Sequence, residues 1–463
     1  MKNFLIKPKI VPPLDKDFRP AVLANHAFLA AVRASAKSTP LVIGLERNDG
    51  FISVFNTQVF QKDASMAQEN LTYVERMVKI LLWQRGGWKV IIGGPEDIGK
   101  HIKKVYSPNG ERRFDVELME RVYERKFTVE VTSPENVPPP REEGTPLGRH
   151  LNGCRIGFDA GASDRKVAAV IDGKEVFTEE VVWDPKSQSD PDYHYSHIQD
   201  ALHSAAKHLP RVNAIGISSA GIYINNRVMV ASLFRGVPHD VFEKRIKNIF
   251  LDIKKEWGNI PLEVINDGEV TALAGSMSLN VNRVLGIALG SSQAGGYVNK
   301  DGNITGWLNE LAFAPVDYNP DAPLDEWSGD RGCGVQYFSQ VAAIRLAASA
   351  GITLDNSHTP AEKLKSIQSL LATQDTRAIE IFETIGCYMG YAVAHYADFY
   401  DLEHVLILGR VTSGDGGNII LKKSKEVLQK EFPTLFERII LHLPDESSRR
   451  VGQAIAAASL PAL

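Results

Sequence analysis

Cysteine is scarce in this chain. Only three cysteines occur among the 463 residues, Cys154, Cys333 and Cys387, and no two of them form a CxxC pair. A disulfide framework and a cysteine-rich metal centre both need paired or closely spaced thiols. The sequence therefore excludes the disulfide-stabilised secreted class, and we expect a protein of the reducing cytoplasm.

Long hydrophobic runs and an excess of one charge are missing too. No uninterrupted apolar stretch approaches the ~18 residues that span a bilayer, and the N-terminal MKNFLIKPKIVPP lacks the sustained apolar core of a targeting segment. The formal net charge is −4, from 52 basic and 56 acidic residues. Proteins that bind nucleic acid usually carry a basic surplus, so we expect neither a membrane nor a nucleic-acid partner.

What the chain does contain is a series of four glycine-bearing segments. They are 158–170 (FDAGASDRKVAAV), 264–275 (VINDGEVTALAG), 286–298 (GIALGSSQAGGYV) and 405–418 (VLILGRVTSGDGGN). Each runs an apolar β-type stretch into a turn of Gly, Ser, Asp or Asn. Such turns deliver backbone N–H groups to phosphate, so the series suggests a nucleotide-dependent phosphotransferase.

The first segment predicts a hairpin that grips phosphate. Residues 156–159 and 166–170 read as two strands joined by a tight turn. Gly161 lets the backbone approach an anion, Ser163 offers a hydroxyl donor, and Asp159 is suited to hold Mg²⁺ directly or through water. Taken alone, such a pattern is more often a plain β-turn.

The second segment places Asn266 and Asp267 after an apolar strand, 262–265, and before a helical stretch, 270–274. Side chains at such a strand end face a crevice in α/β proteins. Asp267 is suited to accept the proton of an attacking hydroxyl, and Asn266 to position the substrate. Simple capping of the helix explains either residue equally well.

The third and fourth segments complete a nucleotide site in this interpretation. A second hairpin at Gly290, Ser291 and Ser292 would grip the β- and γ-phosphates, and the loop that begins at Gly409, before a helix over 419–432, would accept an adenine. A glycine-rich hairpin turn and an ordinary loop before a helix are the commoner explanations of each segment by itself.

The order and spacing of all four segments resemble the actin-like, hexokinase and heat-shock ATPase superfamily, and within it the ROK family of sugar kinases and repressors. The first hairpin of that family usually reads Asp, any residue, Gly, Gly, Thr; Asp159, Gly161 and Ser163 match it, with Ala162 at the second glycine. The resemblance runs from about residue 153 to the C-terminus. It implies an α/β, two-lobed actin-like ATPase (ribonuclease H-like) fold with a cleft, and it implies ATP and Mg²⁺.

The resemblance also assigns residues. It places Asp267 on the catalytic aspartate, with Asn266 before it as the family has, Gly290 and Ser291 on the second phosphate motif, and Gly409 on the adenosine motif.

The sugar side of the site follows from two further segments. WLNELAFAPVD, residues 307–317, looks like the Gly-Glu-Ile-Gly-His segment of the family and places Glu310 on its sugar-binding glutamate. The turn from Ser218 to Gly221 resembles the glycine-rich loop on the sugar side.

Two departures from the family pattern concern metal and substrate. Phe313 stands where the family has a zinc-binding histidine, and RGCGVQYFSQ, residues 331–340, offers the single thiol of Cys333. A structural zinc needs about four ligands, so we predict no such site. Val335 falls on a second sugar-binding glutamate, and the loss of polar contacts implies a changed substrate or lost activity.

Composition along the chain suggests four parts. A proline-rich, charged stretch, SPENVPPPREEGTPL, marks a linker, and three strands within 41–92 indicate α/β structure before it. The predicted parts are an N-terminal α/β extension (1–132), a linker (133–150), a first kinase lobe (151–275) and a second kinase lobe (276–463).

We therefore predict a carbohydrate kinase that transfers phosphate from ATP, with Mg²⁺, to a sugar or sugar-like hydroxyl. The alternative is a catalytically weak or inactive sugar-binding or regulatory protein of the same fold. A repressor is disfavoured, because the extension shows strands and no DNA-reading helix. ROK relatives are often dimers or tetramers, so the resemblance implies a homo-oligomer, with a dimer expected.

Overall fold

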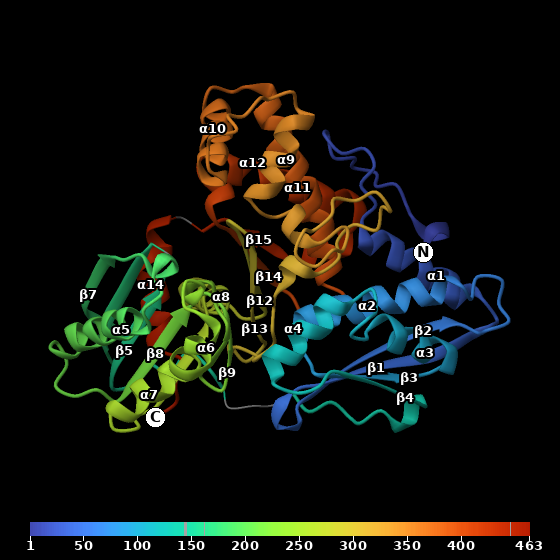
Figure 1. Cartoon of the computed structure of the whole chain (residues 1–463). Helices are drawn as coiled ribbons and strands as arrows, with labels where there is room; N and C mark the ends of the chain where they lie inside the picture. Colours follow the sequence, from blue (N-terminus) through green and yellow to red (C-terminus); the bar gives the residue numbers. More distant parts are fainter. Residues whose placement is uncertain (143–145, 162, 445) are drawn as a thin grey trace. The chain divides into compact units, whose positions relative to one another are not determined.

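The computed structural model describes residues 1–142, 146–161, 163–444 and 446–463 (Figure 1). The contacts within the chain define two compact units, and strands β12 (Val284–Leu289) and β13 (Gln293–Val298) each have residues in both units. The first unit contains Met1–Glu143, Ile287–Gly295 and Trp307–Leu443, and the second contains Gly144–Gly286, Gly296–Gly306 and Pro444–Leu463.

The N-terminal part of the first unit is an α/β module. Its sheet has the order β2-β1-β3-β4, in which β1 is antiparallel to β2 and β3 while β3 is parallel to β4. Figure 1 shows helix α2 running along this sheet. The elements are α1 (Ala21–Ala34), β1 (Ser38–Glu46), β2 (Ile52–Phe60), α2 (Glu69–Arg85), β3 (Lys89–Gly93), α3 (Glu96–Val105), α4 (Arg113–Tyr123) and β4 (Thr128–Thr132).

The three strands predicted for this module are confirmed, and the sequence analysis missed β4. The segment TVEVT alternates polar and apolar residues, which is a strand signal, but it is only five residues long and follows a charged stretch. The predicted linker is not wholly irregular either, since Pro134–Asn136 forms a 3₁₀ turn and Arg141 pairs with Ile52.

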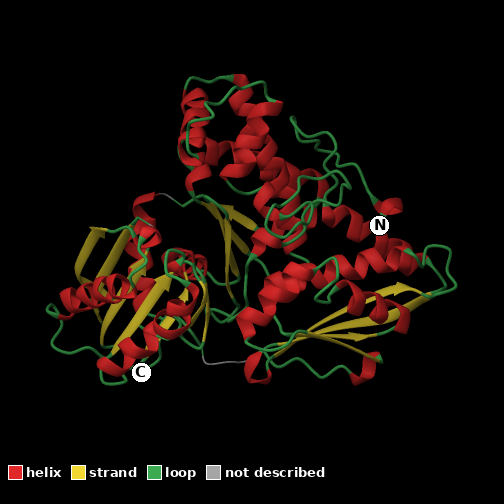
Figure 2. Cartoon of the chain, viewed as in Figure 1, coloured by secondary structure: helices red, strands yellow, loops and turns green. Residues whose placement is uncertain are grey.

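The remainder of the first unit is mainly helical (Figure 2). A sheet of order β13-β12-β14-β15 carries the third and fourth glycine segments, and β14 runs parallel to β15. The helices and strands here are η7 (Leu311–Phe313), η8 (Gly334–Gln336), α9 (Gln340–Ser349), α10 (Pro360–Ala372), α11 (Thr376–Tyr396), β14 (His404–Leu408), α12 (Asp415–Glu431), α13 (Pro433–Arg438) and β15 (Ile440–His442).

The second unit is built on a sheet of order β11-β8-β5-β6-β7. Strands β11, β8 and β5 are parallel, whereas β6 is antiparallel to both β5 and β7. The main elements are β5 (Cys154–Ala160), β6 (Asp164–Ile171), β7 (Lys174–Val182), α5 (Pro191–Ala206), β8 (Ala214–Ser219), α7 (Ile249–Glu256), β11 (Leu262–Asn266), α8 (Asp267–Leu279) and α14 (Glu446–Ala458).

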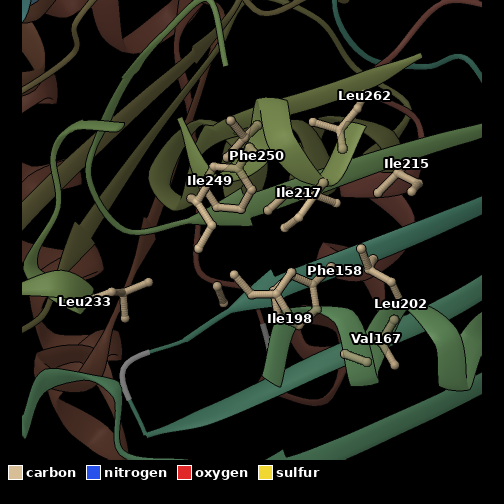
Figure 3. Close-up of a cluster of buried hydrophobic side chains, with 14 of the residues drawn as sticks. Phe158, Val167, Ile198, Leu202, Ile215, Ile217, Leu233, Ile249, Phe250 and Leu262 are labelled. Atoms are coloured by element: carbon tan, nitrogen blue, oxygen red, sulfur yellow. The ribbon is translucent and has the colours of Figure 1, made fainter. Parts of the chain in front are cut away.

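The core of this unit lies against one face of the sheet. Figure 3 shows Phe158 and Ile217 from the strands gathered with Ile198 of α5 and Phe250 of α7. All seven residues of β5 are buried, as are all six of β8. Parallel strands covered on both faces show this continuous apolar pattern, which is why the sequence predicted them clearly.

Helix α14 packs on the other face of the sheet, with its backbone very close to the backbones of β5 and β8. A Cβ added at Gly157 would lie 1.8 Å from the carbonyl oxygen of Ala454, and one added at Gly216 would lie 1.6 Å from that of Ala457. Only glycine permits this approach of helix backbone to strand backbone. These two glycines therefore set the distance between α14 and the strands that carry the candidate site.

Candidate functional site

The predicted residues of the second unit lie along one edge of its sheet. The parallel register pairs Asp159 of β5 with Ser218 of β8, and Ser219 of β8 with Asn266 of β11. All of these residues stand at the carboxyl ends of their strands, the position where α/β proteins bind ligands. The sequence placed Asp159 and Asn266 at strand ends and Ser218 in the turn after a strand; in the structure β8 continues through Ser219, and the sheet order makes these residues neighbours.

Asp159 is buried, with 8% of its surface exposed, and it is held by two side-chain donors. Its Oδ1 accepts hydrogen bonds from the hydroxyl of Ser218 (2.8 Å) and from Nε2 of Gln453 (3.2 Å). Burial raises the pKa of Asp159 to about 6, and the charge of Asp267 acts in the same direction. A cation beside this carboxylate would offset the cost of burying its charge.

Gln453 is a site residue that the sequence analysis missed. It lies on α14, and its Nε2 also contacts the hydroxyl of Ser218 at 3.1 Å. The residue is 294 positions from Asp159 along the chain, and the surrounding VGQAIAAA carries no motif that would single it out.

Asn266 and Asp267 begin helix α8. The Oδ1 of Asn266 accepts from the N–H of Gly268 (2.8 Å), and its Nδ2 donates to the carbonyl of Gly221 (2.8 Å). The amide thus caps the helix and also fixes the loop after β8, so capping and site architecture are combined in one side chain.

Asp267 is a half-buried residue at the start of the helix. Its Oδ1 accepts from the N–H of Gly268 (2.9 Å), while burial raises the pKa of Asp267 from its usual value. A carboxylate with a raised pKa that still reaches the surface is the stronger proton acceptor.

The first hairpin has the predicted strands, β5 and β6, around its turn. The carbonyl of Gly161 accepts from the indole N–H of Trp183 (2.8 Å), and the exposed hydroxyl of Ser163 donates to Asp164 (3.3 Å). Ala162 lies outside the described residues. A Cβ at Gly161 would come within 2.5 Å of the carbonyl oxygen of Asp164, so the turn requires glycine there.

The third and fourth segments meet within the first unit. The turn between β12 and β13 exposes Ser291 and Ser292, and the N–H of Gly290 bonds to the carbonyl of Ser292 (2.9 Å). Gly409 has a φ of 104°, and a Cβ on it would lie 2.5 Å from the carbonyl oxygen of Leu289. The structure therefore brings Gly409 against the residue that precedes Gly290.

The later glycines of the fourth segment, Gly416 and Gly417, are packed closely. A Cβ at Gly416 would lie 2.6 Å from the ring of Phe382, and one at Gly417 would lie 2.6 Å from the carbonyl of Thr412. These glycines face the protein itself. Gly414, with a φ of 65°, faces open space.

Glu310 and Phe313 lie in the first unit beside helix α2. The N–H of Glu310 donates to the carbonyl of Trp83 (2.9 Å). The ring of Phe313 packs on those of Trp83 and Phe114, with centroid distances of 4.3 and 5.4 Å. The apolar residue at position 313 is thus part of an aromatic cluster with the N-terminal module.

Cys333 is buried beside the buried carboxylate of Asp330. Burial raises the pKa of the Cys333 thiol to about 12, and its Sγ lies 3.8 Å from Oδ2 of Asp330. Val335 is half-buried, and its carbonyl accepts from Ser339 (2.7 Å). Within the described part of the chain, no group of three or more His, Cys, Asp or Glu side chains is arranged to hold a metal ion.

Two other features of the described residues bear on the site. A cavity of about 910 Å³ lies in the N-terminal module, lined by α1, β1, β2, α2, Asp398 and Phe399, and none of the predicted site residues lines it. No helix in 1–142, 146–161, 163–444 or 446–463 is both long and apolar enough to cross a membrane.

Known structures share this fold. A ROK hexokinase from Thermus thermophilus superposes with a TM-score of 0.51 and 17% identity, covering 66% of this chain and 96% of that one. A ROK family transcriptional regulator, a homologue of the Mlc protein of E. coli, also gives 0.51, with 18% identity over 67% of this chain and 79% of that one. The protein therefore has the α/β fold of the actin-like ATPases, which serves both enzymes and regulators.

The chain belongs to the ROK family, whose model matches residues 155–459. The glucokinase of Halalkalibacterium halodurans is 28% identical in an alignment 193 residues long that covers 38% of this chain. The chain spans 56% of the length of that glucokinase. The N-terminal module precedes the matched range and lies outside the family match.

Proposed function

We propose that this protein is an ATP-dependent kinase of a sugar or a sugar-like polyol. The observation that carries the proposal is the register of β5, β8 and β11, which sets Asp159, Ser218 and Asn266 on one sheet edge with Asp267 directly after them. Two carboxylates of raised pKa at such an edge are suited to metal binding and to proton transfer. Membership of a family that includes sugar kinases supports the same conclusion.

Asp267 is the proposed general base. Its carboxylate takes the proton of the acceptor hydroxyl as the oxygen attacks the γ-phosphorus of ATP, and the bond from that phosphorus to the bridging oxygen breaks to release ADP. The proton leaves Asp267 to solvent after product release. Asn266, whose amide is fixed by Gly221 and Gly268, orients the acceptor.

Phosphate binding is assigned to the turns. Gly161 and Ser163 would contact the phosphates from the first hairpin, and Gly290, Ser291 and Ser292 from the second, because their N–H and hydroxyl groups stabilise charge on the oxygens. Gly409 would border the adenosine.

Asp159 is the proposed holder of Mg²⁺. Its carboxylate oxygens are the ligand type that Mg²⁺ prefers, and its buried position makes a nearby cation favourable. Bound Mg²⁺ would neutralise charge on the β- and γ-phosphates. Ser218 and Gln453 orient the carboxylate through their hydrogen bonds.

On the acceptor side, Glu310 and the loop from Ser218 to Gly221 are the proposed contacts. Ser218 and Gly221 are buried or half-buried in the second unit, and Glu310 belongs to the first unit. We propose a cytoplasmic enzyme, in keeping with its three free, buried cysteines, and we propose that it acts as a homodimer.

A second candidate function follows from Phe313 and Val335. Apolar side chains at both places favour a protein that binds a sugar but turns it over weakly or not at all. The similarity to a transcriptional regulator concerns the fold alone.

The test is ADP release from Mg-ATP across hexoses, N-acetylhexosamines and polyols, with the Asp267→Asn variant beside the wild type. We expect turnover that depends on one acceptor class and falls by at least about 10²-fold in the variant. Glu263→Gln is the matched control, since Glu263 is a half-buried carboxyl on the same strand, β11, away from its end. Thermal stabilisation by a sugar, with no turnover of any acceptor, would favour the binding protein instead.

A further inference from the structure

The segment that carries Glu310 has little regular structure of its own. Between Trp307 and Phe338 the only helical pieces are η7 and η8, of three residues each, and the rest is loop and turn (Figure 2). The segment has some backbone pairing of its own, in the bridges of Pro315 with Cys333 and of Leu324 with Arg331, but none of these bridges includes Asn309 or Glu310. Its geometry therefore depends on the elements that pack against it.

The C-terminal end of α2 binds the main chain at Glu310. The N–H of Asn309 donates to the carbonyl of Gln84 (2.8 Å), and the N–H of Glu310 donates to that of Trp83 (2.9 Å). The last carbonyls of a helix have no partner within the helix. In α2, two of these carbonyls accept hydrogen bonds from consecutive residues of the segment, Asn309 and Glu310.

The side chains of Gln84 and Tyr400 add hydrogen bonds next to this contact. The buried amide of Gln84 donates to the carbonyl of Phe399 (3.0 Å), and the hydroxyl of the next residue, Tyr400, donates to Oδ1 of Asn309 (2.6 Å). Asn309 has a φ of 49°, a left-handed conformation that asparagine tolerates better than most residues. Main chain and side chain of Asn309 are thus both fixed.

The same helix also fixes the far end of the segment. Arg76 makes a two-point contact with Asp330 (2.8 and 3.1 Å), and Nζ of Lys79 lies 3.4 Å from Asp330 and 3.0 Å from Asp115. Arg112 adds a further contact to Asp330 (2.8 Å). Lys79 and Asp115 are 1% exposed. Removing one partner of such a buried set leaves an uncompensated charge, so these contacts are costly to break.

The middle of the segment packs on the same module. The rings of Trp83, Phe114 and Phe313 pack on one another, and the indole N–H of Trp83 donates to Asp115 (3.0 Å). One helix outside the family match thus contacts the segment at 309–310, at 313 and at 330.

We propose that helix α2 is a positioning element of the acceptor subsite. By holding the main chain of Glu310, it sets how the glutamate meets the hydroxyls of a polyhydroxylated acceptor, with Trp83, Gln84 and Tyr400 as positioning residues. This inference rests on the proposed function, in which Glu310 contacts the acceptor. The N-terminal module is then a working part of the kinase.

The first test is the Tyr400→Phe variant. It keeps the ring, which packs on Trp307 with centroids 5.9 Å apart, and it removes the hydroxyl that fixes Asn309. We expect the KM for the acceptor to rise about fivefold, from the loss of one hydrogen bond, with the KM for ATP unchanged. Tyr391→Phe is the matched control, because it removes a hydroxyl bound to Glu431 (2.6 Å) elsewhere in the same unit; its acceptor KM should equal that of the wild type.

The second test measures hydrogen–deuterium exchange in the segment and does not depend on catalysis. In Gln84→Ala, hydrogen–deuterium exchange of the peptide containing Asn309 and Glu310 should be faster, while exchange of a peptide over 154–160 should not change. Equal exchange in variant and wild type overturns the inference. Faster exchange with an unchanged acceptor KM in both Gln84→Ala and Tyr400→Phe also overturns it, because α2 would then have a structural role only.

The two proposals fail in different ways. Wild-type protein that turns over no acceptor rules out the proposed function, and the inference with it. Wild-type turnover together with an unaltered acceptor KM in both Gln84→Ala and Tyr400→Phe rules out the inference alone.

Discussion

The hydroxyl of Ser218 donates a 2.8 Å hydrogen bond to Oδ1 of Asp159, and the two residues are direct partners in the parallel pairing of β8 with β5. A residue of the neighbouring strand thus holds this buried carboxylate, and Gln453 of α14 donates a further hydrogen bond to it. Burial raises the pKa of the Asp159 carboxyl to about 6, and the hydrogen bond from Ser218 opposes this rise because it favours the charged form.

The first prediction concerns the metal. Replacing Asp159 by Asn should raise the Mg²⁺ concentration for half-maximal turnover by about 10- to 100-fold. In the wild type the same quantity should rise as the pH falls from 7.5 to 5.5, because protonation near pH 6 competes with the metal. Steady-state rates over a Mg²⁺ series at both pH values measure both effects, and an equal pH dependence in wild type and variant would contradict the assignment.

The second prediction concerns stability and the same residue. The folded pKa of Asp159, about 6, lies above its ordinary value of 3.8, so the folded state binds more protons between these values. Its stabilising contribution is therefore present below about pH 4 and is lost as the pH rises through about 6. The Tm of Asp159→Asn relative to the wild type should be higher at pH 8 than at pH 4.5. Thermal unfolding followed by circular dichroism at both pH values provides the check.

The third prediction concerns Gln453. Gln453→Leu removes a donor from Asp159 and should move the acid limb of the Mg²⁺-dependent rate upward by about 0.5–1 pH unit, since a hydrogen bond contributes about 1 kcal/mol. Ser218→Ala, which removes the shorter bond, should move it in the same direction. A full pH–rate profile of each variant is the measurement, and an unmoved limb in both would argue against this role.

The fourth prediction tests the packing of α14. An alanine at Gly216 would place its Cβ 1.6 Å from the carbonyl oxygen of Ala457, and overpacking of this kind typically costs about 1–3 kcal/mol or more. Gly452→Ala on the same helix is the control, because the added Cβ would make an ordinary contact of 3.7 Å with Ala274. Urea unfolding should show a loss for Gly216→Ala and no loss for Gly452→Ala.

The fifth prediction tests the buried charges under α2. Lys79→Met leaves Asp115 without its cation and should lower the free energy of unfolding by about 3–5 kcal/mol. Lys100→Met removes an exposed pair with Glu96 and should change it by less than about 0.5 kcal/mol. Similar unfolding midpoints for the two variants would contradict the account of the network.

The elements around the four glycine segments could be predicted from the sequence. Each is a buried strand that ends in a turn, and the information lies in adjacent residues: β5 is buried throughout, and Asn266 caps the helix that follows β11. The strand β4 was missed although TVEVT alternates polar and apolar residues, because the stretch is short and its pairing partner β3 lies over 30 residues earlier.

The sequence by itself determined the family, the order of strands and turns, and the positions of Asp159 and Asp267 at strand ends, because these depend on short-range patterns of burial and backbone freedom. Only the tertiary structure decided that Gln453 meets Asp159 and that α2 holds Glu310. Both contacts join segments that lie hundreds of residues apart in the sequence. A hydrogen bond from a side-chain amide, or one to a carbonyl at a helix end, produces no repeating pattern of residue types from which it could be predicted.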